Sequence, residues 1–333
     1  MPAEWAPHRA TWIAWPSHGD LWGEALEGVR AAFVDMSTAI AGHDGRGEEL
    51  YVLVPDEENE RLAREALSRL PCRFHRIPFG DIWLRDTAPI FLVNDGEVAA
   101  ASFVFNGWGG KYELPGDAQV SERVAAASGA RTHRFDWVLE GGAVEVDGQG
   151  TCLTTRQCLL NPNRNPGVSE EEIERRLREG LGVSRVLWLD EGLKNDHTDG
   201  HVDTLARFVS PGVVVCMEPQ WEDPNASALE AVLRDLRSFT DVRGRKLDVF
   251  TLPSPGRVVD RDERLMPASY ANFYVGNAAV VVPVYGVPED EDAVRRVAAL
   301  FPGREAVPVP AKELLEGGGA FHCITQQMPR GTR

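Results

Sequence analysis

The sequence predicts an α/β fold in which strand pairs and helices alternate in about five ββαβ-type units. Four predicted strand pairs flank turn-forming segments, namely Asn94-Asp95-Gly96, Asp147-Gly148, Ser210-Pro211-Gly212 and Gly276-Asn277. Positions 95, 147, 211 and 276 of these turns are separated by 52, 64 and 65 residues, which is the regular spacing of a repeat architecture. Helical patterns fill the intervals, so each unit combines strands with a helix.

The predicted elements follow in order along the chain. The strand pairs are 90–93 with 97–100, 143–146 with 151–154, 205–209 with 213–216, and 272–275 with 278–282. Single strands are predicted at 50–54, 186–189 and 247–252, and amphipathic helices at 24–41, 58–70, 118–127, 170–179, 225–239 and 289–301. Ser169 and Glu172 form a capping box at the start of the helix at 170–179, and Gly180 and Gly182 mark its end.

The fifth unit is split between the two ends of the chain. Apolar residues at 11–15 predict one of its strands, and residues 321–325 predict the partner strand. Pairing these two strands would close the units into a ring and remove exposed strand edges. We therefore expect residues 1–333 to form one α/β domain.

Composition narrows the function classes. The 333 residues are 43% hydrophobic and 26% charged, as in globular proteins. The net charge of −16 disfavours nucleic acid or an anionic membrane as a partner and suits a cationic substrate. No run of about 20 apolar residues predicts a membrane span, and the first residues lack the basic and apolar regions of a signal peptide. The five cysteines include no Cys-x-x-Cys pair, so we expect the reducing cytoplasm.

Short polar motifs precede the strand pairs. They are Trp83-Leu84-Arg85-Asp86, Glu140-Gly141-Gly142 and His201-Val202-Asp203, and the predicted last strand carries Cys323 after Gly317, Gly318 and Gly319. Equivalent positions in a closed ring face its axis, so we expect Asp86, Glu140, His201, Asp203 and Cys323 to converge. The glycines allow a ligand to approach the backbone closely, or they form only a loop.

Several of these residues also have purely structural interpretations. Asp86 could form a surface ion pair with Arg85, and Glu140 could be a plain turn residue. The cysteines at 72, 152, 158 and 216 are expected to fill the core. The segment 196–203 holds two His and three Asp in eight residues, a density that packing rarely requires, so it favours a functional role.

A cysteine together with a histidine predicts nucleophilic catalysis in which the histidine carries protons. Three acids around a thiol raise its pKa and oppose the thiolate, unless the substrate is itself a cation. A planar guanidinium binds carboxylates through paired hydrogen bonds and offsets their charge. The candidate set therefore points to a guanidine-modifying cysteine enzyme.

Two other function classes stay open on the residues alone. His197, Asp199, His201 and Asp203 alternate, so a strand would place them on one face, where they could bind Zn²⁺ or Mn²⁺ in a metal-dependent hydrolase. A ring of this kind could also be a binding protein without chemistry. Inactivation by iodoacetamide would favour the cysteine enzyme, and inactivation by EDTA would favour the metal hydrolase.

Further motifs run in order from residue 1 to residue 329. They are Met1-Pro2-Ala3-Glu4-Trp5-x-Pro7-His8, Trp12-x-x-Trp15-Pro16, Trp83-Leu84-Arg85-Asp86-Thr87-x-Pro89, and the segments 105–110, 139–142, 161–166, 198–203 and 317–327. Together they resemble the agmatine deiminase family, which is grouped with the bacterial peptidyl-arginine deiminases in the guanidine-modifying (pentein) superfamily. The resemblance implies a five-bladed α/β propeller, in agreement with the split ring.

The resemblance also implies roles for the candidate residues. Cys323 would be the nucleophile and His201 the general acid and base. Asp86 and Asp203 would hold the guanidinium nitrogens, and Glu140 would pair with His201 and the substrate. Trp83, Gly318 and Gly319 would line the substrate site. No metal or organic cofactor is implied.

The implied reaction converts agmatine into N-carbamoylputrescine and ammonia through a covalent thiouronium on Cys323, a step of polyamine synthesis. Ala320 and Phe321 stand where the family usually has Asn and Ile, and the stretch 252–266 is short. These departures concern the substrate tail, so peptidyl arginine or another alkylguanidine remains an alternative to agmatine. The expected partner is a small cationic guanidine, and a homo-oligomer is left open.

Overall fold

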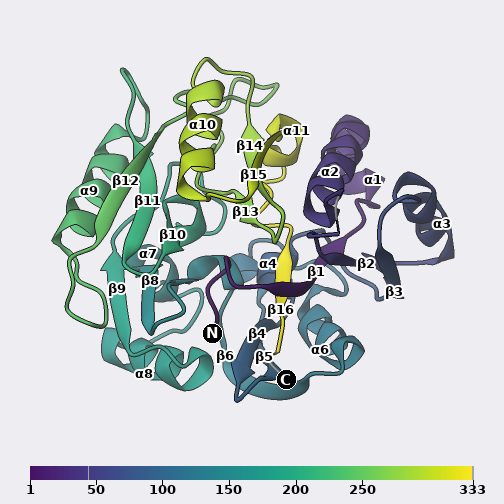
Figure 1. The fold of residues 1–333 in the computed structure, drawn as a ribbon, viewed down its shortest axis with the longest axis horizontal. Helices are drawn as coiled ribbons and strands as arrows, with labels where there is room; N and C mark the ends of the chain where they lie inside the picture. Colours follow the sequence, from purple (N-terminus) through teal and green to yellow (C-terminus); the bar gives the residue numbers. More distant parts are fainter. Residues whose placement is uncertain (44, 332–333) are drawn as a thin grey trace.

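A computed structural model describes residues 1–43 and 45–331. Within them the strands form five separate small sheets, and no sheet of this described part closes on itself (Figure 1). Four sheets have three strands in chain order, in which the first two are antiparallel and the third is parallel to the second. These strands are β4 (Ile90–Asn94), β5 (Glu97–Val104) and β6 (Arg131–Val138); β7 (Glu145–Val146), β8 (Thr151–Thr155) and β9 (Arg185–Leu189); β10 (Ala206–Ser210), β11 (Val213–Glu218) and β12 (Asp248–Pro253); and β13 (Tyr274–Val275), β14 (Ala279–Val284) and β15 (Glu305–Pro310).

The fifth sheet joins the two ends of the chain, as predicted. Its strand order is β16-β1-β2-β3, and β16 (Gln326–Pro329) runs antiparallel to β1 (His8–Ala14). The strands β2 (Glu49–Val54) and β3 (Cys72–Arg76) continue the sheet in parallel. The predicted strand at 321–325 was wrong, because these residues form turns in which the Thr325 hydroxyl donates to the carbonyl of Phe321 at 2.8 Å.

The predicted strand pairs are all present, with small shifts at their ends. In the β4–β5 pair Asn94 faces Glu97, and the two turn residues between them, Asp95 and Gly96, have φ of 47° and 81°. Positive φ at both positions gives the turn whose twist matches the two strands. The strands β3, β6 and β15 were not predicted. They lie at sheet edges and carry charged residues or proline, so they lack a clear apolar pattern.

All six predicted helices are present, and each precedes the last strand of a three-stranded sheet or lies between the parallel strands of the fifth sheet, which are β1, β2 and β3. They are α2 (Leu26–Ala41), α3 (Glu57–Ala66), α6 (Asp117–Ser128), α8 (Glu170–Leu181), α9 (Ala226–Ser238) and α10 (Asp290–Leu300). As predicted, the Ser169 side chain caps α8 by accepting from the Glu172 N–H, and Gly182 ends the helix with φ of 71°. The helix continues through Gly180, and α3 ends before the predicted residue 70.

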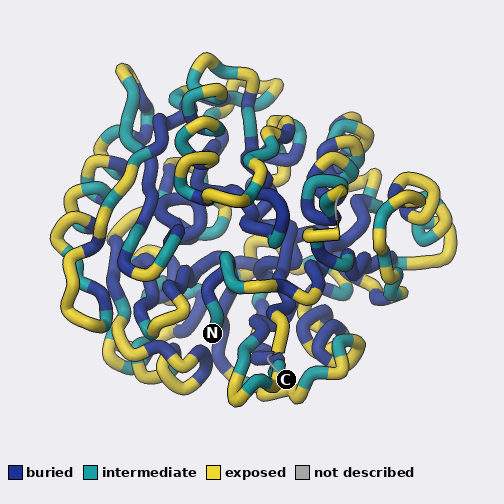
Figure 2. Tube along the Cα trace, viewed as in Figure 1, coloured by how far each residue is buried: buried dark blue, intermediate teal, exposed yellow. Residues whose placement is uncertain are grey.

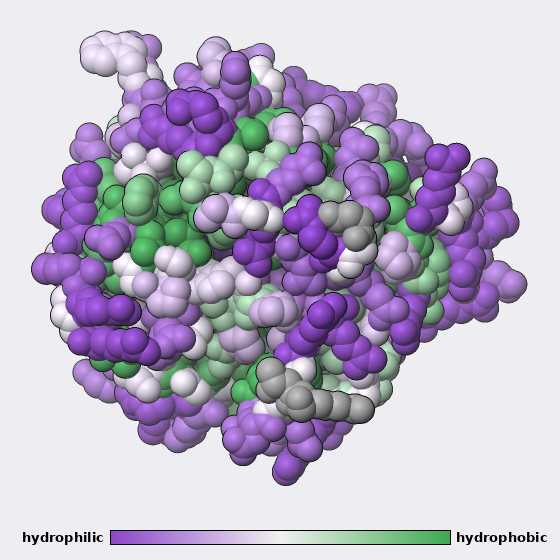
Figure 3. Space-filling model, viewed as in Figure 1, coloured by the Kyte–Doolittle hydropathy of each residue, from purple (hydrophilic) through white to green (hydrophobic). Residues whose placement is uncertain are grey.

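The helices lie toward the outside of the molecule and the strands toward its interior (Figure 1). Buried residues follow the inner strands, whereas the outer faces of the helices are exposed (Figure 2). Hydrophilic side chains cover most of the face in Figure 3, with hydrophobic ones showing between them. Within the described ranges no helix has both the length and the apolar character needed to cross a bilayer.

Short helical turns come directly before three of the strand pairs. They are α4 (Leu84–Thr87), η2 (Gly141–Ala143) and η3 (Val202–Thr204); the other short helices are α1 (Gly19–Trp22), η1 (Gly23–Ala25), α5 (Gly107–Gly110), α7 (Arg156–Leu159) and α11 (Lys312–Leu315). Helix α4 packs on η2, and η2 packs on η3. The repeat thus brings the polar motifs of three separate units into one place.

Candidate active site

A cavity of about 320 Å³ is lined by residues of α4 and of the segment 317–323. Four aromatic side chains line it, those of Trp22, Trp83, Trp108 and Tyr112. Asp86 and Cys323 also line it, as do Gly317, Gly318 and Gly319. A carboxylate and a thiol in an aromatic cavity suit a cationic ligand with an apolar stem.

At each of the three positions 317–319 the structure requires glycine, because of close neighbours or an unusual backbone conformation. A Cβ on Gly317 would lie 2.7 Å from the Trp83 ring, and a Cβ on Gly319 would lie 2.9 Å from Cys323 Sγ. Gly318 has φ of 108°, a conformation that other residues rarely adopt. The glycines therefore form a loop that also brings backbone to the wall of the cavity.

Cys323 lies on the turn before β16, with 6% of its surface exposed. Its Sγ is 3.2 Å from Asn272 Nδ2 and 3.6 Å from Asp203 Oδ2. Burial raises the pKa of the Cys323 thiol well above its usual value, and the carboxylates of Asp203 and Asp86 raise it further. A cation bound between these carboxylates would act in the opposite direction and favour the thiolate.

Asp203 lies beside this thiol through Oδ2 and has one oxygen, Oδ1, without a partner among the described residues. Its Oδ2 lies 2.7 Å from His322 Nδ1, whereas the buried Oδ1 has no hydrogen-bond partner among the residues that the structure describes. Burial alone raises the pKa of the Asp203 carboxyl, but the hydrogen bond and charge of His322 outweigh burial and leave this pKa below its usual value. Asp203 is therefore an ionised carboxylate with an open acceptor.

Asp86 is held by two neutral donors. The Gly142 N–H donates to its Oδ1 and the Trp108 Nε1–H to its Oδ2, each at 2.9 Å. Burial raises the pKa of the Asp86 carboxyl, and the nearby Glu140 and Asp203 act in the same direction. The surface ion pair with Arg85 considered from the sequence is wrong, because both residues are buried and Arg85 instead contacts Glu4 at 3.0 Å.

His201 lies between two of the acids. Its Nδ1 is 3.8 Å from Asp86 Oδ2, and its Nε2 is 3.8 Å from Glu140 Oε2. In the described part of the chain neither ring nitrogen has a hydrogen-bond partner, although the ring is fully buried. Burial lowers the pKa of His201, but Asp86, Cys158 and Glu140 together raise it well above its usual value. The ring is therefore charged and able to give a proton.

Glu140 is not a plain turn residue. It is fully buried, and its Oε1 accepts from Arg164 Nε at 2.7 Å. Burial raises the pKa of the Glu140 carboxyl, but His201 and Arg164 outweigh it and leave this pKa below its usual value. Arg164 also pairs with Asp199 at 2.7 Å, so Asp199 supports the partner of Glu140.

Gly142 shows how closely these groups converge. A Cβ at this position would lie 2.5 Å from His201 Nδ1 and 3.0 Å from both Asp203 Oδ2 and Asp86 Oδ1. The predicted convergence of the candidate residues is therefore what the structure shows, around a backbone position that only glycine can fill.

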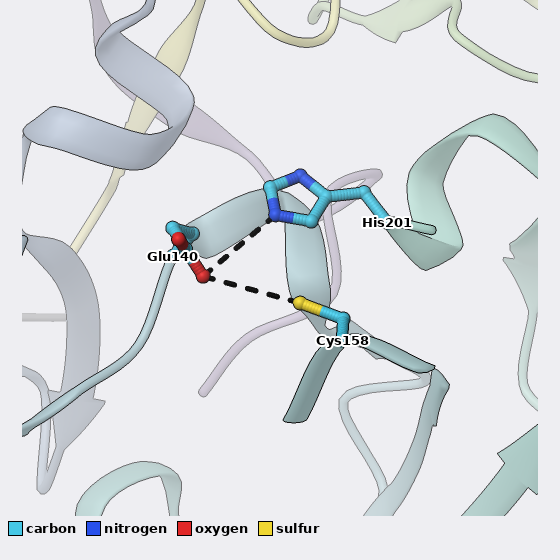
Figure 4. A group of neighbouring side chains, drawn as sticks. All are labelled: Glu140, Cys158 and His201. Carbon is cyan, nitrogen blue, oxygen red and sulfur yellow. Dashed lines mark hydrogen bonds and ion pairs between the residues drawn. The ribbon is translucent and has the colours of Figure 1, made fainter. Parts of the chain in front are cut away.

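One group of three residues has the geometry to hold a metal ion, among those the structure describes. Ligand atoms of Glu140, Cys158 and His201 lie within 4.8 Å of one another (Figure 4). Arg164 already neutralises Glu140, so a divalent cation would lie beside a fixed positive charge. Cys158 is buried, as expected for a core cysteine, but its Sγ also lies 4.0 Å from Glu140 Oε2.

The metal site considered from the alternating residues was wrong in its geometry. The segment 196–203 forms turns and the start of η3 rather than a strand. His197 Nδ1 lies 3.3 Å from the Tyr112 hydroxyl, and Asp199 is paired with Lys111 and Arg164. These contacts separate His197 and Asp199 from the pair His201 and Asp203.

Sequence reasoning did not assign Trp108, Arg164, Asn272 or His322. Trp108 and Arg164 fall in the motifs at 105–110 and 161–166, which were noticed without a role. Trp108 has φ of 52°, an unusual conformation for a bulky residue and a mark of functional constraint. Asn272 comes just before β13, the position at which motifs precede the other strand pairs, so the repeat itself could have found it.

Comparisons with known proteins agree with this geometry. The chain matches the Porphyromonas-type peptidyl-arginine deiminase family over residues 1–329. An agmatine deiminase from Ectopseudomonas mendocina is 40% identical over 354 residues, covering 99% of this chain and 95% of the relative. The structure of an Enterococcus faecalis agmatine deiminase has a TM-score of 0.93 at 34% identity, covering 100% of this chain and 96% of that chain. A C. jejuni agmatine deiminase with substrate bound has a TM-score of 0.90 at 28% identity, with the same coverage. As its motifs predicted, the chain belongs to the Porphyromonas-type peptidyl-arginine deiminase family.

Proposed function

We propose that this chain is a guanidine deiminase that hydrolyses agmatine to N-carbamoylputrescine and ammonia. The observation that carries the proposal is the cluster around Cys323, in which the carboxylates of Asp86 and Asp203 lie with His201 near a buried thiol. Relatives named agmatine deiminases over almost the whole chain support the same reaction. We propose as site residues the set that the motifs predicted, namely Cys323, His201, Glu140, Asp203 and Asp86.

The first half of the reaction uses the charge of the substrate. The guanidinium binds between Asp86 and Asp203, offsets their charge and lowers the pKa of Cys323. The thiolate attacks the guanidinium carbon and forms a C–S bond. His201 gives its proton to one amino group, the C–N bond breaks, and ammonia leaves a thiouronium on Cys323.

The second half returns the enzyme to its starting state. Neutral His201 takes a proton from water, and the resulting hydroxide adds to the thiouronium carbon. The C–S bond breaks with its electron pair on sulfur, so the thiolate leaves, and loss of one proton gives the ureido product. Glu140 stabilises the charged His201, because its carboxylate lies 3.8 Å from the ring.

The proposal extends to the whole fold. The five sheets are the blades of a five-bladed α/β propeller that forms one domain from residue 1 to 333. The pairing of β1 with β16 supports this arrangement, since it joins the ends of the chain within one sheet. The position of motifs before successive strand pairs supports it as well.

We prefer agmatine to peptidyl arginine because two further acids line the same cavity. Asp81 and Glu316 line it together with Trp22 and Trp83. The second cation of agmatine can use such acids, whereas an arginine side chain within a peptide has no second charge. Asp81 accepts from the indole N–H groups of Trp22 at 3.0 Å and Trp83 at 2.8 Å, and so fixes both rings.

The test measures ammonia and ureido product from agmatine, free arginine and a blocked arginine peptide. We expect agmatine to be turned over fastest, and Cys323→Ala to abolish turnover while Cys72→Ala, on the remote strand β3, does not. Faster turnover of the peptide would reassign the substrate. Failure of all three substrates with reduced, folded protein would contradict the proposed function.

A further inference from the structure

We propose that His322 is a positioning residue: Glu4 holds its ring as a doubly protonated imidazolium, and the ring orients Asp203 toward the substrate. The inference rests on the proposed function, since it deepens the role of Asp203 at the same site. It concerns the histidine next to the nucleophile and an acid near the N-terminus, which the reaction above does not use.

The contacts of His322 define its protonation. Its ring is buried, with Nδ1 2.7 Å from Asp203 Oδ2 and Nε2 2.9 Å from Glu4 Oε2. Ionised carboxylates only accept hydrogen bonds. Both ring nitrogens must therefore carry a proton if both acids are ionised.

Glu4 is held as a carboxylate by its surroundings. Its Oε1 accepts from Arg207 Nη2 at 2.9 Å and from the Val275 N–H at 2.8 Å, and its Oε2 accepts from Arg85 Nη2 at 3.0 Å. Burial raises the pKa of Glu4, but Arg207, His322 and Arg85 outweigh it and leave this pKa well below its usual value. Glu4 therefore has no proton to offer the ring.

The charges of the buried cluster point the same way. Its acids are Glu4, Glu145 and Asp203, and its other cations are Arg85 and Arg207. When all three acids are ionised, a neutral His322 would leave this group with one unbalanced negative charge away from water, which is costly. A charged ring balances three carboxylates with three cations.

The charged ring has a direct consequence for Asp203. It occupies Oδ2 and leaves Oδ1, which has no hydrogen-bond partner within the described residues, for the guanidinium N–H groups. Arg85 contacts the backbone of both His322 and the nucleophile. Its Nε donates to the carbonyl of His322 at 3.2 Å, and its backbone N–H donates to the carbonyl of Cys323 at 3.1 Å. One set of contacts therefore positions both the thiol and the carboxylate.

Two variants separate orientation from folding. In His322→Asn the amide nitrogen lies near the Nδ1 position and can still donate to Asp203. In His322→Gln it reaches toward the Nε2 position and Glu4, and the contact with Asp203 is lost. We expect kcat/KM for agmatine to fall about tenfold in His322→Asn and about 100-fold in His322→Gln, with a higher KM in the second.

The matched control is His133→Asn, which changes an exposed ring on β6 and should match the wild type. Values within twofold of wild type for both His322 variants would overturn the inference. Equal losses that follow a common fall in melting temperature would also overturn it, because a purely structural role predicts that result.

The pH profile gives a second readout. The charged groups that face His322 are Asp203, Glu4, Glu145, Arg85 and Arg207. Loss of the imidazolium removes a positive charge that lowers the pKa of Asp203. The acid limb of kcat/KM should therefore move to higher pH in both His322 variants. An unmoved acid limb in both would contradict the inference.

A third measurement does not depend on activity. In ¹⁵N-histidine NMR of the wild type, we expect His322 to show protons on both ring nitrogens, with assignment by their loss in His322→Asn. His75, whose pKa burial lowers, should serve as the neutral reference. A single ring proton on His322 would overturn the inference even if agmatine is turned over. If His322 carries two ring protons but agmatine is not turned over, the result contradicts the proposed function and not the protonation of His322.

Discussion

Asp86 and Asp203 both face the candidate substrate site, but their surroundings differ. Among the described residues Asp86 accepts only from neutral donors, the N–H groups of Gly142 and Trp108, and its pKa is raised, first by burial. Asp203 accepts from His322, and its pKa is lowered although burial opposes this. The difference teaches that neutral donors, even with His201 3.8 Å away, do not offset the effect of burial on the pKa of Asp86, whereas the directly bonded His322 does so for Asp203.

The largest expected effect comes from removing either carboxylate. We expect Asp203→Asn to lower kcat/KM for agmatine about 1000-fold and Asp86→Asn about 100-fold at pH 8, because the pKa of Asp203 is lowered whereas that of Asp86 is raised. Asp95→Asn, in the turn between β4 and β5, is the control and should be unchanged. A larger loss in Asp86→Asn than in Asp203→Asn would break the comparison.

A smaller loss is expected from Gly142→Ala. The added Cβ would lie 2.5 Å from His201 Nδ1, so the ring must move from its place between Asp86 and Glu140. We expect kcat to fall about 100-fold or less. In Gly19→Ala the Cβ would meet only Leu26 Cδ2, at 3.8 Å, so this control should keep its activity. Equal activity of the two variants would show that His201 does not need its observed position.

Removing one neutral donor sharpens the comparison. Trp108→Phe takes away the N–H bonded to Asp86 Oδ2 and should raise the pKa of that carboxyl further. The reaction needs the ionised form, so the acid limb of kcat/KM moves to higher pH, with about a tenfold loss at pH 6 and less at pH 8. Trp188→Phe, which removes an indole donor to Glu174 far from the site, is the matched control. A loss independent of pH would point to ring packing instead.

The smallest effect concerns stability and a third buried carboxylate. Within the part of the chain that the structure describes, Asp117 accepts only from the N–H groups of Gly80 and Asp81, and burial raises its pKa to about 6. Because this folded pKa lies above the usual 3.8, the protonated form favours the folded state. The contribution of protonated Asp117 to the free energy of unfolding is at most about 3 kcal/mol. It is fully present below about pH 4 and is lost as the pH rises through 6.

Asp117→Asn keeps an acceptor for Gly80 and does not titrate. Its melting temperature should therefore fall a few degrees less than that of the wild type between pH 5 and pH 8. Asp95→Asn should behave as the wild type does. Parallel curves for Asp117→Asn and wild type would show that neutral donors suffice to hold this acid ionised.

The repeat and the motifs before each strand pair predicted most of the fold and the convergence of the five candidate residues. The edge strands β3, β6 and β15 escaped prediction because charged residues and proline replace an apolar pattern there. The partners of the site residues escaped for another reason. Glu4, Arg164 and His322 act through ion pairs with residues 24 to 318 positions away, and nothing in local sequence indicates such pairs.

The most direct test of the central claim is to trap the intermediate on Cys323. Acid quenching during turnover of agmatine, followed by peptide mass spectrometry, should find the Cys323 peptide heavier by agmatine less one ammonia. The Cys72 and Cys158 peptides should be unmodified, and Cys323→Ala should show no adduct. Turnover at full rate with no adduct in rapidly quenched samples, or turnover by Cys323→Ala, would contradict covalent catalysis at this site.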